Sequence, residues 1–241
     1  MSRLIPKELI PHTLWDSESS VLHLPPQLIS SWKTLLEKNG LLDKAKTRAP
    51  EGFEGGMSKE DTDNHFAWRF TGSSARVILS MLDPKQDLDE ISDVFTQFFS
   101  GNRIFLADLP CGSGAASLSI LSVYCELRKQ GLVPREPLEV IIAGGEISEF
   151  AQCYANEGLI SLINDLEEQA IKIEFEVMDW DVCDPFSNAQ LINHLTVRSQ
   201  GCSAKVLVLA TFLGFCKEIK NGMMLKSKSM SSSTSISEKQ A

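Results

Sequence analysis

Short apolar runs alternate with longer amphipathic stretches through the second half of the chain. The apolar runs have the length of buried strands, and the stretches between them carry apolar residues at helical spacing. Such alternation is typical of βαβ crossovers and predicts an α/β fold built on a parallel sheet. The predicted strands are residues 104–107, 139–143, 172–177 and 205–210, and the predicted helices are residues 114–130, 148–166 and 186–197.

The first hundred residues have a different pattern, in which helical periodicity is interrupted by proline and glycine. Over residues 1–50 prolines break the chain into short helical pieces, and a longer amphipathic helix is predicted over residues 28–36, with Gly40 as its end. Residues 48–58 contain one proline and three glycines, which indicates a hinge or a surface loop.

Two further helices are predicted before the first strand. One runs from Ser73 to near Pro84, and the other covers residues 87–99 and has acidic residues in its first turn. The apolar positions of the second helix recur at helical spacing, so we expect it to bury Ile91, Val94, Phe95 and Phe98.

The composition changes after Cys216, where the chain becomes rich in serine and lysine and contains no aromatic residue. Such a segment offers too little apolar surface to fold, so a disordered tail is predicted. The expected organisation is a helical lobe or lid over residues 1–100, a sheet domain over residues 101–216 and a polar tail over residues 217–241.

Charge and cysteine content narrow the possible partners and the compartment. The formal net charge is −9, and the residues up to Cys216 carry 18 basic and 30 acidic side chains, which is not the basic footprint of a duplex-binding protein. Six cysteines without a CxxC pair argue against a zinc site and against a disulfide framework, and they fit a reducing cytoplasm. The apolar runs are shorter than the roughly 20 residues of a membrane span, so no membrane partner is expected.

The candidate chemistry begins at Asp108, an acid at the end of the first predicted strand. The turn LPCGSG (residues 109–114) and the start of a helix follow it. Gly112 and Gly114 lack a Cβ, so backbone N–H groups there can approach a ligand. A carboxylate at this position suits a ligand with hydroxyl or ammonium donors. It would crowd a pyrophosphate, so a dinucleotide-binding dehydrogenase is disfavoured.

From Asp108 to Gly114 the sequence resembles motif I of the class I S-adenosylmethionine-dependent methyltransferases, which is an acid at the end of the first strand followed by alternating glycines. Pro110 takes the place of the first glycine. The resemblance covers residues 101–215 and implies a three-layer Rossmann-like sheet that binds S-adenosylmethionine as methyl donor. In that family the strand order is 3-2-1-4-5-7-6, and the four strands predicted here would correspond to 3-2-1-4.

Acids at the next strand ends extend the resemblance. In this family an acid after the second strand accepts hydrogen bonds from the ribose hydroxyls, which implies that role for Glu146. An acid after the third strand accepts from the adenine amino group; Asp179 or Asp181 fits, and Asp179 is favoured by its place at the strand end. Trp180 either packs against adenine or belongs to the core. The implied cofactor contacts are Asp108, Pro110, Cys111, Gly112, Gly114, Glu146, Ile147, Asp179 and Trp180.

The methyl acceptor and the catalytic residues stay open. Ala210, Thr211 and Phe212 at the end of the fourth strand provide no general base, so no catalytic residue is assigned. Residues 65–76 combine aromatic and arginine side chains. They either contact the substrate from a lid or form an amphipathic helix docked on the sheet domain.

The fifth, sixth and seventh strands of that family have no counterpart among the apolar runs of this sequence. A truncated reading frame, favoured by the change in composition after Cys216, a split enzyme and an atypical short domain are the three explanations. The fourth strand would be a hydrophobic edge able to pair with another chain, which predicts a homo- or hetero-oligomer. The expected function is methyl transfer from S-adenosylmethionine; the alternatives are a non-catalytic module acting through a partner protein and an inactive truncated fragment.

Overall fold

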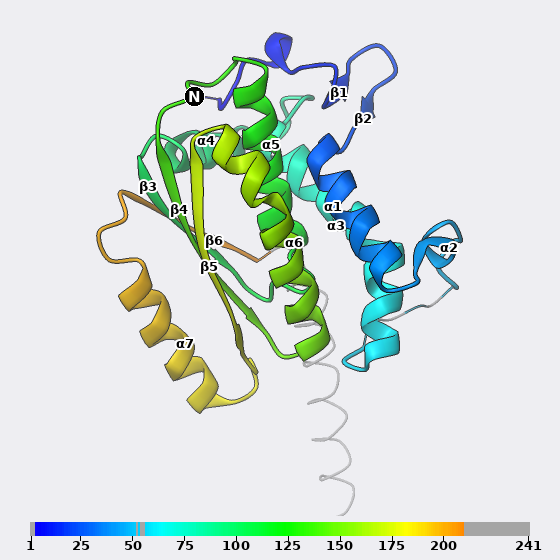
Figure 1. Ribbon diagram of the computed structural model, residues 1–241. Helices are drawn as coiled ribbons and strands as arrows, with labels where there is room; N and C mark the ends of the chain where they lie inside the picture. Colours follow the sequence, from blue (N-terminus) through cyan, green and yellow to red (C-terminus); the bar gives the residue numbers. More distant parts are fainter. Residues whose placement is uncertain (1–2, 52, 54–55, 210–241) are drawn as a thin grey trace, which may run out of the picture. The chain divides into compact units, whose positions relative to one another are not determined.

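Four parallel strands form the centre of the fold in the computed structural model, which describes residues 3–51, 53 and 56–209 (Figure 1). Their order across the sheet is β5-β4-β3-β6, and every neighbouring pair is parallel. The predicted α/β class with a parallel sheet is therefore confirmed. The strands are β3 (Arg103–Asp108), β4 (Leu138–Glu146), β5 (Ile171–Asp179) and β6 (Ala204–Val208).

The two central strands, β3 and β4, are buried on both faces, as their nearly continuous apolar sequences require. Alternate side chains of β3 point to opposite faces of the sheet. Ile104 and Leu106 join the large core on one face, whereas Phe105 and Ala107 pack on the other face with Leu195.

Helices cover both faces of the sheet. α5 (Ala115–Lys129) and α6 (Glu149–Glu168) lie on one face and α7 (Pro185–Arg198) lies on the other (Figure 1). Ser148 and Asp184 begin α6 and α7, respectively, by accepting hydrogen bonds from free backbone N–H groups of the first turn. These caps fix where each helix starts relative to the strand before it.

The N-terminal region is more varied than the sequence predicted. Its elements are the 3₁₀ helix η1 (Lys7–Leu9), β1 (Trp15–Asp16), β2 (Val21–Leu22), α1 (Pro26–Lys38), α2 (Leu42–Ala45), α3 (Lys59–Leu82) and α4 (Asp89–Phe98). The hairpin of β1 and β2 lies where short helical segments were expected. α3 starts well before the predicted Ser73, because the Ser58 hydroxyl accepts a hydrogen bond from the N–H of Asp61 and caps a longer helix.

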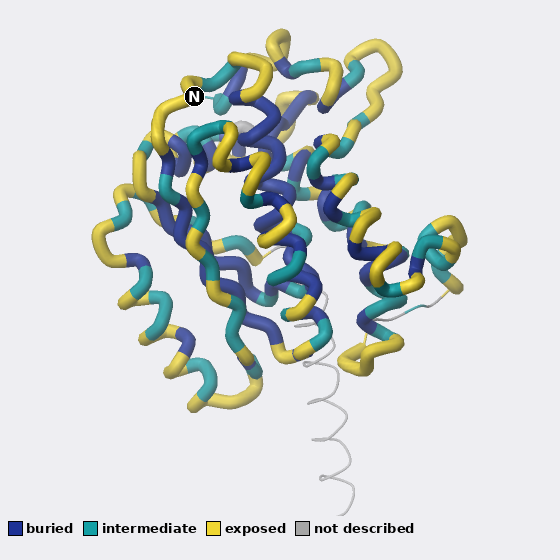
Figure 2. The backbone as a smooth tube through the Cα atoms, viewed as in Figure 1, coloured by how far each residue is buried: buried dark blue, intermediate teal, exposed yellow. Residues whose placement is uncertain are grey.

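One hydrophobic core joins the N-terminal helices to the sheet. It includes Leu28 of α1 and Phe66 of α3 together with Leu118 of α5 and Leu159 of α6. The dark blue segments of Figure 2 run through the strands and along the helices that pack on this face. The residues expected to form a helical lobe and those expected to form a sheet domain therefore belong to one shared core.

The burial expected for α4 is partly wrong. Phe95 and Phe98 lie in the core, but Ile91 and Val94 are 42% and 46% exposed. The buried side of α4 is centred on Ser92, Phe95 and Phe98 and contacts α3 and β6. The apolar stripe of α4 is thus wider than the face that packs, and periodicity alone does not show which part of it is covered.

Some expectations fall beyond the described ranges. The predicted end of the fourth strand at residue 210 and the predicted tail over residues 217–241 lie outside the described residues. Within the described part of the chain, β6 pairs with β3 alone, and Leu207 is 55% exposed. No helix in that part combines the length and the apolar character needed to cross a bilayer.

Candidate functional site

Three strand ends meet at the carboxyl edge of the sheet. The register places Asp108 of β3 beside Gly144 of β4, and Glu146 of β4 beside Asp179 of β5. The glycine turn over residues 109–114 connects β3 to α5 at the same edge. Parallel α/β sheets bind ligands outside the carboxyl ends of their strands, so this edge is the candidate site.

Asp108 is buried at the end of β3, with 1% of its surface exposed. Its Oδ2 accepts hydrogen bonds from the Ser117 backbone N–H at 3.1 Å and from the Ser117 hydroxyl at 2.7 Å. Its Oδ1 is buried and has no hydrogen-bond partner among the described residues. α5 therefore satisfies one carboxylate oxygen, and the other has no donor in the described part of the chain.

Burial also changes the acidity of Asp108. Desolvation raises its pKa to about 7, the hydrogen bonds from Ser117 oppose that shift, and the charge of Glu146 adds to it. Near neutral pH this carboxyl is divided between its protonated and ionised forms. A cationic or hydrogen-bond-donating ligand beside it would favour the ionised form.

The two glycines of the turn have different surroundings. Both have positive φ, +52° at Gly112 and +79° at Gly114, which favours glycine at each position. A Cβ on Gly114 would lie 3.1 Å from the Cα of Ala155, so the turn packs directly on α6. A Cβ on Gly112 would meet no atom within 4 Å, so the backbone there borders open space. Pro110, which precedes them, is half-buried.

Cys111 closes the turn against the end of β4. Its backbone N–H donates to the Gly145 carbonyl at 3.0 Å, and its Sγ would lie 3.1 Å from a Cβ on Gly144. A Cβ on Gly145 would approach Leu109 to 2.8 Å and Trp180 to 3.1 Å. Burial raises the pKa of the Cys111 thiol well above its ordinary value, so the side chain fills space here and is not a thiolate nucleophile at neutral pH.

Glu146 joins the glycine turn to the start of α6. Its Oε2 accepts from the Gly112 backbone N–H at 3.0 Å, and its Oε1 accepts from the Ser148 backbone N–H at 2.9 Å. Glu146 as a whole is 9% exposed. Two backbone donors thus hold the charged group in one orientation at the strand end.

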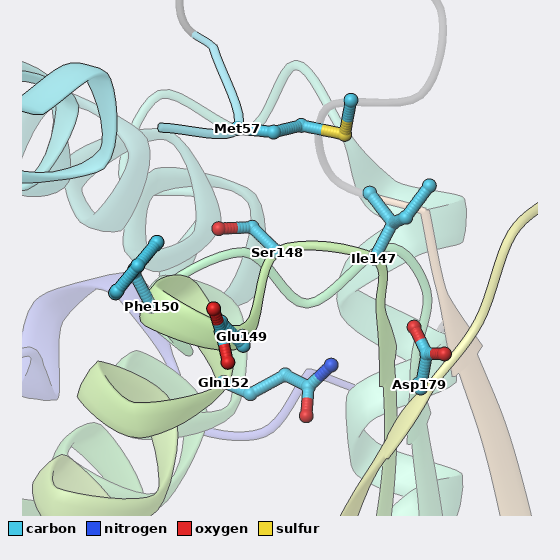
Figure 3. Close-up of a pocket in the computed structure, with 7 residues that line it drawn as sticks. All are labelled: Met57, Ile147, Ser148, Glu149, Phe150, Gln152 and Asp179. Carbon is cyan, nitrogen blue, oxygen red and sulfur yellow. The ribbon is translucent and has the colours of Figure 1, made fainter. Parts of the chain in front are cut away.

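A pocket of about 430 Å³ lies at the ends of β4 and β5. Its polar lining is acidic or neutral, since the described residues that line it include no lysine or arginine. In Figure 3, Met57 lies above Ile147 and Ser148, and Gln152 and Asp179 lie below them. The lining residues are Met57, Ile147, Ser148, Glu149, Phe150, Gln152 and Asp179.

The two acids and the tryptophan after β5 occupy different positions. Asp179 is exposed and lines the pocket. Asp181 lies outside the pocket lining and accepts a hydrogen bond from the Cys183 N–H. Trp180 is buried, and its indole N–H donates to the Asn188 Oδ1 of α7 at 2.8 Å. Of the three, Asp179 has direct access to a ligand.

Three parts of the site carry no signal in the sequence pattern that points to their role. Ser117, the partner of Asp108, has no assigned role in the predicted helix, and Gly144 and Gly145 lie between the predicted strand over residues 139–143 and Glu146 without a role of their own. Met57 reaches the pocket from just before α3. The spacing Ser58-x-x-Asp61, a capping signal, marks the helix start next to it.

The aromatic segment of α3 lies mainly in the core. Phe70 is 3% exposed and stacks on Trp32, with ring centroids 6.4 Å apart. The Trp68 indole N–H donates to the Lys44 carbonyl. These contacts fit the docked-helix interpretation of the segment.

No protein-family model matches the chain, and no curated protein or solved structure matches it significantly. Among the described residues no group of three or more histidine, cysteine, aspartate or glutamate side chains is arranged to hold a metal ion.

Proposed function

We propose that this chain binds S-adenosylmethionine at the carboxyl ends of β3, β4 and β5 and transfers its methyl group to an acceptor that the site does not identify. The bound donor would supply an electrophilic methyl group on a sulfonium centre. Asp108, Glu146 and Asp179 are the residues that would hold it, each at the end of a different strand.

The charge of the site carries the proposal. Glu149 and Asp179 line the pocket, Glu146 lies at the neighbouring strand end, and the described lining contains no basic side chain. Such a site opposes the phosphates of a nucleotide and suits a nucleoside whose side chain is cationic. The buried Oδ1 of Asp108, which has no partner among the described residues, would provide an acceptor for an ammonium or hydroxyl group.

The sheet supports the same proposal. Numbered by their order along the chain, the strands lie in the order 3-2-1-4, as in the family that the glycine turn resembles. The turn follows the strand at the centre of this order, where the crossovers reverse direction. Ligands of open α/β sheets bind at this position.

The residues of this chain would act by positioning the donor. Methyl transfer is an in-line displacement, and a general base is needed only where the acceptor must lose a proton. The Glu146 carboxylate is already fixed by two backbone donors, so it needs no reorganisation when ribose hydroxyls arrive.

Calorimetric titration of the full chain with S-adenosylhomocysteine, the demethylated product, tests the proposal. We expect saturable binding, and we expect no binding of a reduced nicotinamide dinucleotide. Asp179→Ala should weaken binding, whereas Glu167→Ala, on an exposed residue at the far end of α6, should not. A folded wild-type chain that binds neither S-adenosylmethionine nor its product would contradict the proposal.

A non-catalytic module that acts through a partner protein is the second candidate. The observation that favours it is the edge of the sheet, where Leu207 and Leu209 are 55% and 49% exposed in the described structure. Light scattering after size exclusion measures the assembly that this edge would form. An assembly that Leu207→Lys dissociates, in a chain that does not bind the donor, would favour this candidate.

A further inference from the structure

The first turns of α3 contact the first turn of α6 beside the pocket. Thr62 of α3 is 4% exposed, and its Oγ1 lies 3.2 Å from the Ser148 hydroxyl in a buried hydrogen bond. Met57, just before α3, lines the pocket that Ser148 also lines. The residue just before α3 therefore contributes to the wall of the pocket, and α3 itself contributes a contact behind it.

Ser148 connects this contact to the carboxylate of the site. Its hydroxyl accepts a hydrogen bond from the Ala151 N–H at 3.3 Å and thereby begins α6. Its backbone N–H donates to the Glu146 Oε1 at 2.9 Å. A displacement of the Ser148 side chain would move the donor that orients Glu146, because the cap and the backbone N–H belong to one residue.

We infer that Thr62 is a positioning residue of the donor site: its hydroxyl holds Ser148, and Ser148 holds the Glu146 carboxylate in the orientation that accepts the ribose hydroxyls. The inference rests on the proposed function. It assigns to the N-terminal helix a part in donor binding that requires no contact between Thr62 and the donor.

A second set of contacts keeps α3 in place without Thr62. The Tyr154 hydroxyl of α6 donates to the Asp63 Oδ1 at 2.7 Å, and the Tyr154 ring stacks on Phe66 with centroids 4.2 Å apart. Loss of the Thr62 hydroxyl should therefore leave the packing of α3 on α6 intact. The effect of that loss on the site is then separable from an effect on folding.

The test compares Thr62→Val, which removes the hydroxyl at nearly constant shape, with Thr62→Ser, which keeps it. Thr96→Val on α4, which does not line the pocket, is the matched control. For each full-length variant, calorimetry measures the Kd for S-adenosylhomocysteine and urea unfolding measures global stability. Amide hydrogen exchange measures the protection of the Ser148 and Gly112 N–H groups that hold Glu146.

We expect Thr62→Val to raise the Kd about three- to ten-fold and to speed exchange at Ser148, as for the loss of one buried hydrogen bond. Thr62→Ser and Thr96→Val should keep both the Kd and the exchange rate at Ser148 near the wild-type values. An unchanged Kd in Thr62→Val, or a raised Kd without faster exchange at Ser148, would overturn the inference.

Two other results of this experiment also lead to a decision on the inference: failure of the wild-type chain to bind the ligand, and failure of Thr62→Val to fold. If the wild-type chain does not bind S-adenosylhomocysteine, the proposed function fails, and exchange at Ser148 alone decides whether Thr62 positions Glu146. If Thr62→Val does not fold, Thr62→Ala removes the same hydroxyl with a smaller side chain and leaves the Ser148 cap and the pocket lining unchanged. The same pair of readouts then applies to that variant.

Discussion

The backbone N–H of Gly112 donates a hydrogen bond of 3.0 Å to the Glu146 Oε2, so the turn after β3 and the end of β4 share one carboxylate. Glu146→Ala removes the acceptor of this N–H and of the Ser148 N–H. We expect the free energy of unfolding to fall by about 2 kcal/mol, because hydrogen bonds to charged groups are lost and two donors stay unpaired. We also expect binding of S-adenosylhomocysteine to weaken at least about ten-fold.

Urea unfolding and calorimetry measure these two effects. Glu146→Gln keeps one acceptor oxygen. Its free energy of unfolding and its affinity for S-adenosylhomocysteine should therefore lie between those of wild type and those of Glu146→Ala. Glu167→Ala, an exposed glutamate of α6, is the control for charge removal. A Glu146→Ala protein with the affinity of wild type would contradict the assignment of Glu146 to the donor site.

Asp108 should make the stability of the chain fall as the pH rises from about 4 to about 7. Its folded-state pKa is raised from 3.8 to about 7, so between these values the folded chain binds more protons than the unfolded chain. The contribution of protonated Asp108 to the free energy of unfolding is fully present below the pKa of the unfolded chain. It is lost as the pH rises through the pKa of the folded chain. The loss is on the order of 4 kcal/mol.

Asp108→Asn tests this prediction, because its side chain stays neutral. Urea unfolding from pH 4 to pH 8 should show a smaller decline for Asp108→Asn than for wild type. Asp87→Asn, at an exposed aspartate, should follow the wild-type curve. If the stability of Asp108→Asn and of wild type changed in parallel with pH, Asp108 would have the same pKa in the folded and in the unfolded chain, which would contradict the prediction.

The acidic strand ends show how far the sequence determines the site. Asp108 was predicted from its place after an apolar run, and Glu146 and Asp179 were predicted from the resemblance to the methyltransferase family. The register brings those strand ends together. Their roles toward a donor stay predictions. Ser117 was not identified as the partner of Asp108, because a serine in a helix is ordinarily explained without a buried carboxylate.

The bounds of β4 show a limit of local patterns. The apolar pattern predicts this strand over residues 139–143. The strand continues to Glu146, because Gly144 and Gly145 leave room for Cys111, Leu109 and Trp180. That requirement comes from residues distant along the chain, which a local pattern does not contain.

Gly145→Ala should destabilise the chain by about 1–3 kcal/mol through overpacking. The added Cβ would lie 2.8 Å from the Leu109 Cδ2 and 3.1 Å from the Trp180 Cε3. Urea unfolding measures the loss. Gly72→Ala is the matched control: its Cβ would meet nothing within 4 Å in α3, so it should stabilise by about 0.5–1 kcal/mol. A neutral Gly145→Ala would show that the strand end tolerates side chains.

Trp180→Phe distinguishes the two interpretations of this tryptophan. The indole is buried and bonded to Asn188, so we expect a loss of about 1–2 kcal/mol in stability and an unchanged affinity for S-adenosylhomocysteine. Trp15→Phe, at an equally buried tryptophan of β1, is the control. A raised Kd in Trp180→Phe with wild-type stability would instead place the ring against adenine.

The N-terminal helices complete their packing only with partners that are synthesised later. As the chain leaves the ribosome, Leu28 and Phe66 emerge before α5 and α6, whose Leu118 and Leu159 belong to the same core. The first hundred residues therefore have no finished core of their own at that stage, and their apolar faces stay open until α6 has emerged. Because these contacts are distant along the chain, we expect the whole described region to fold in one late step rather than lobe by lobe.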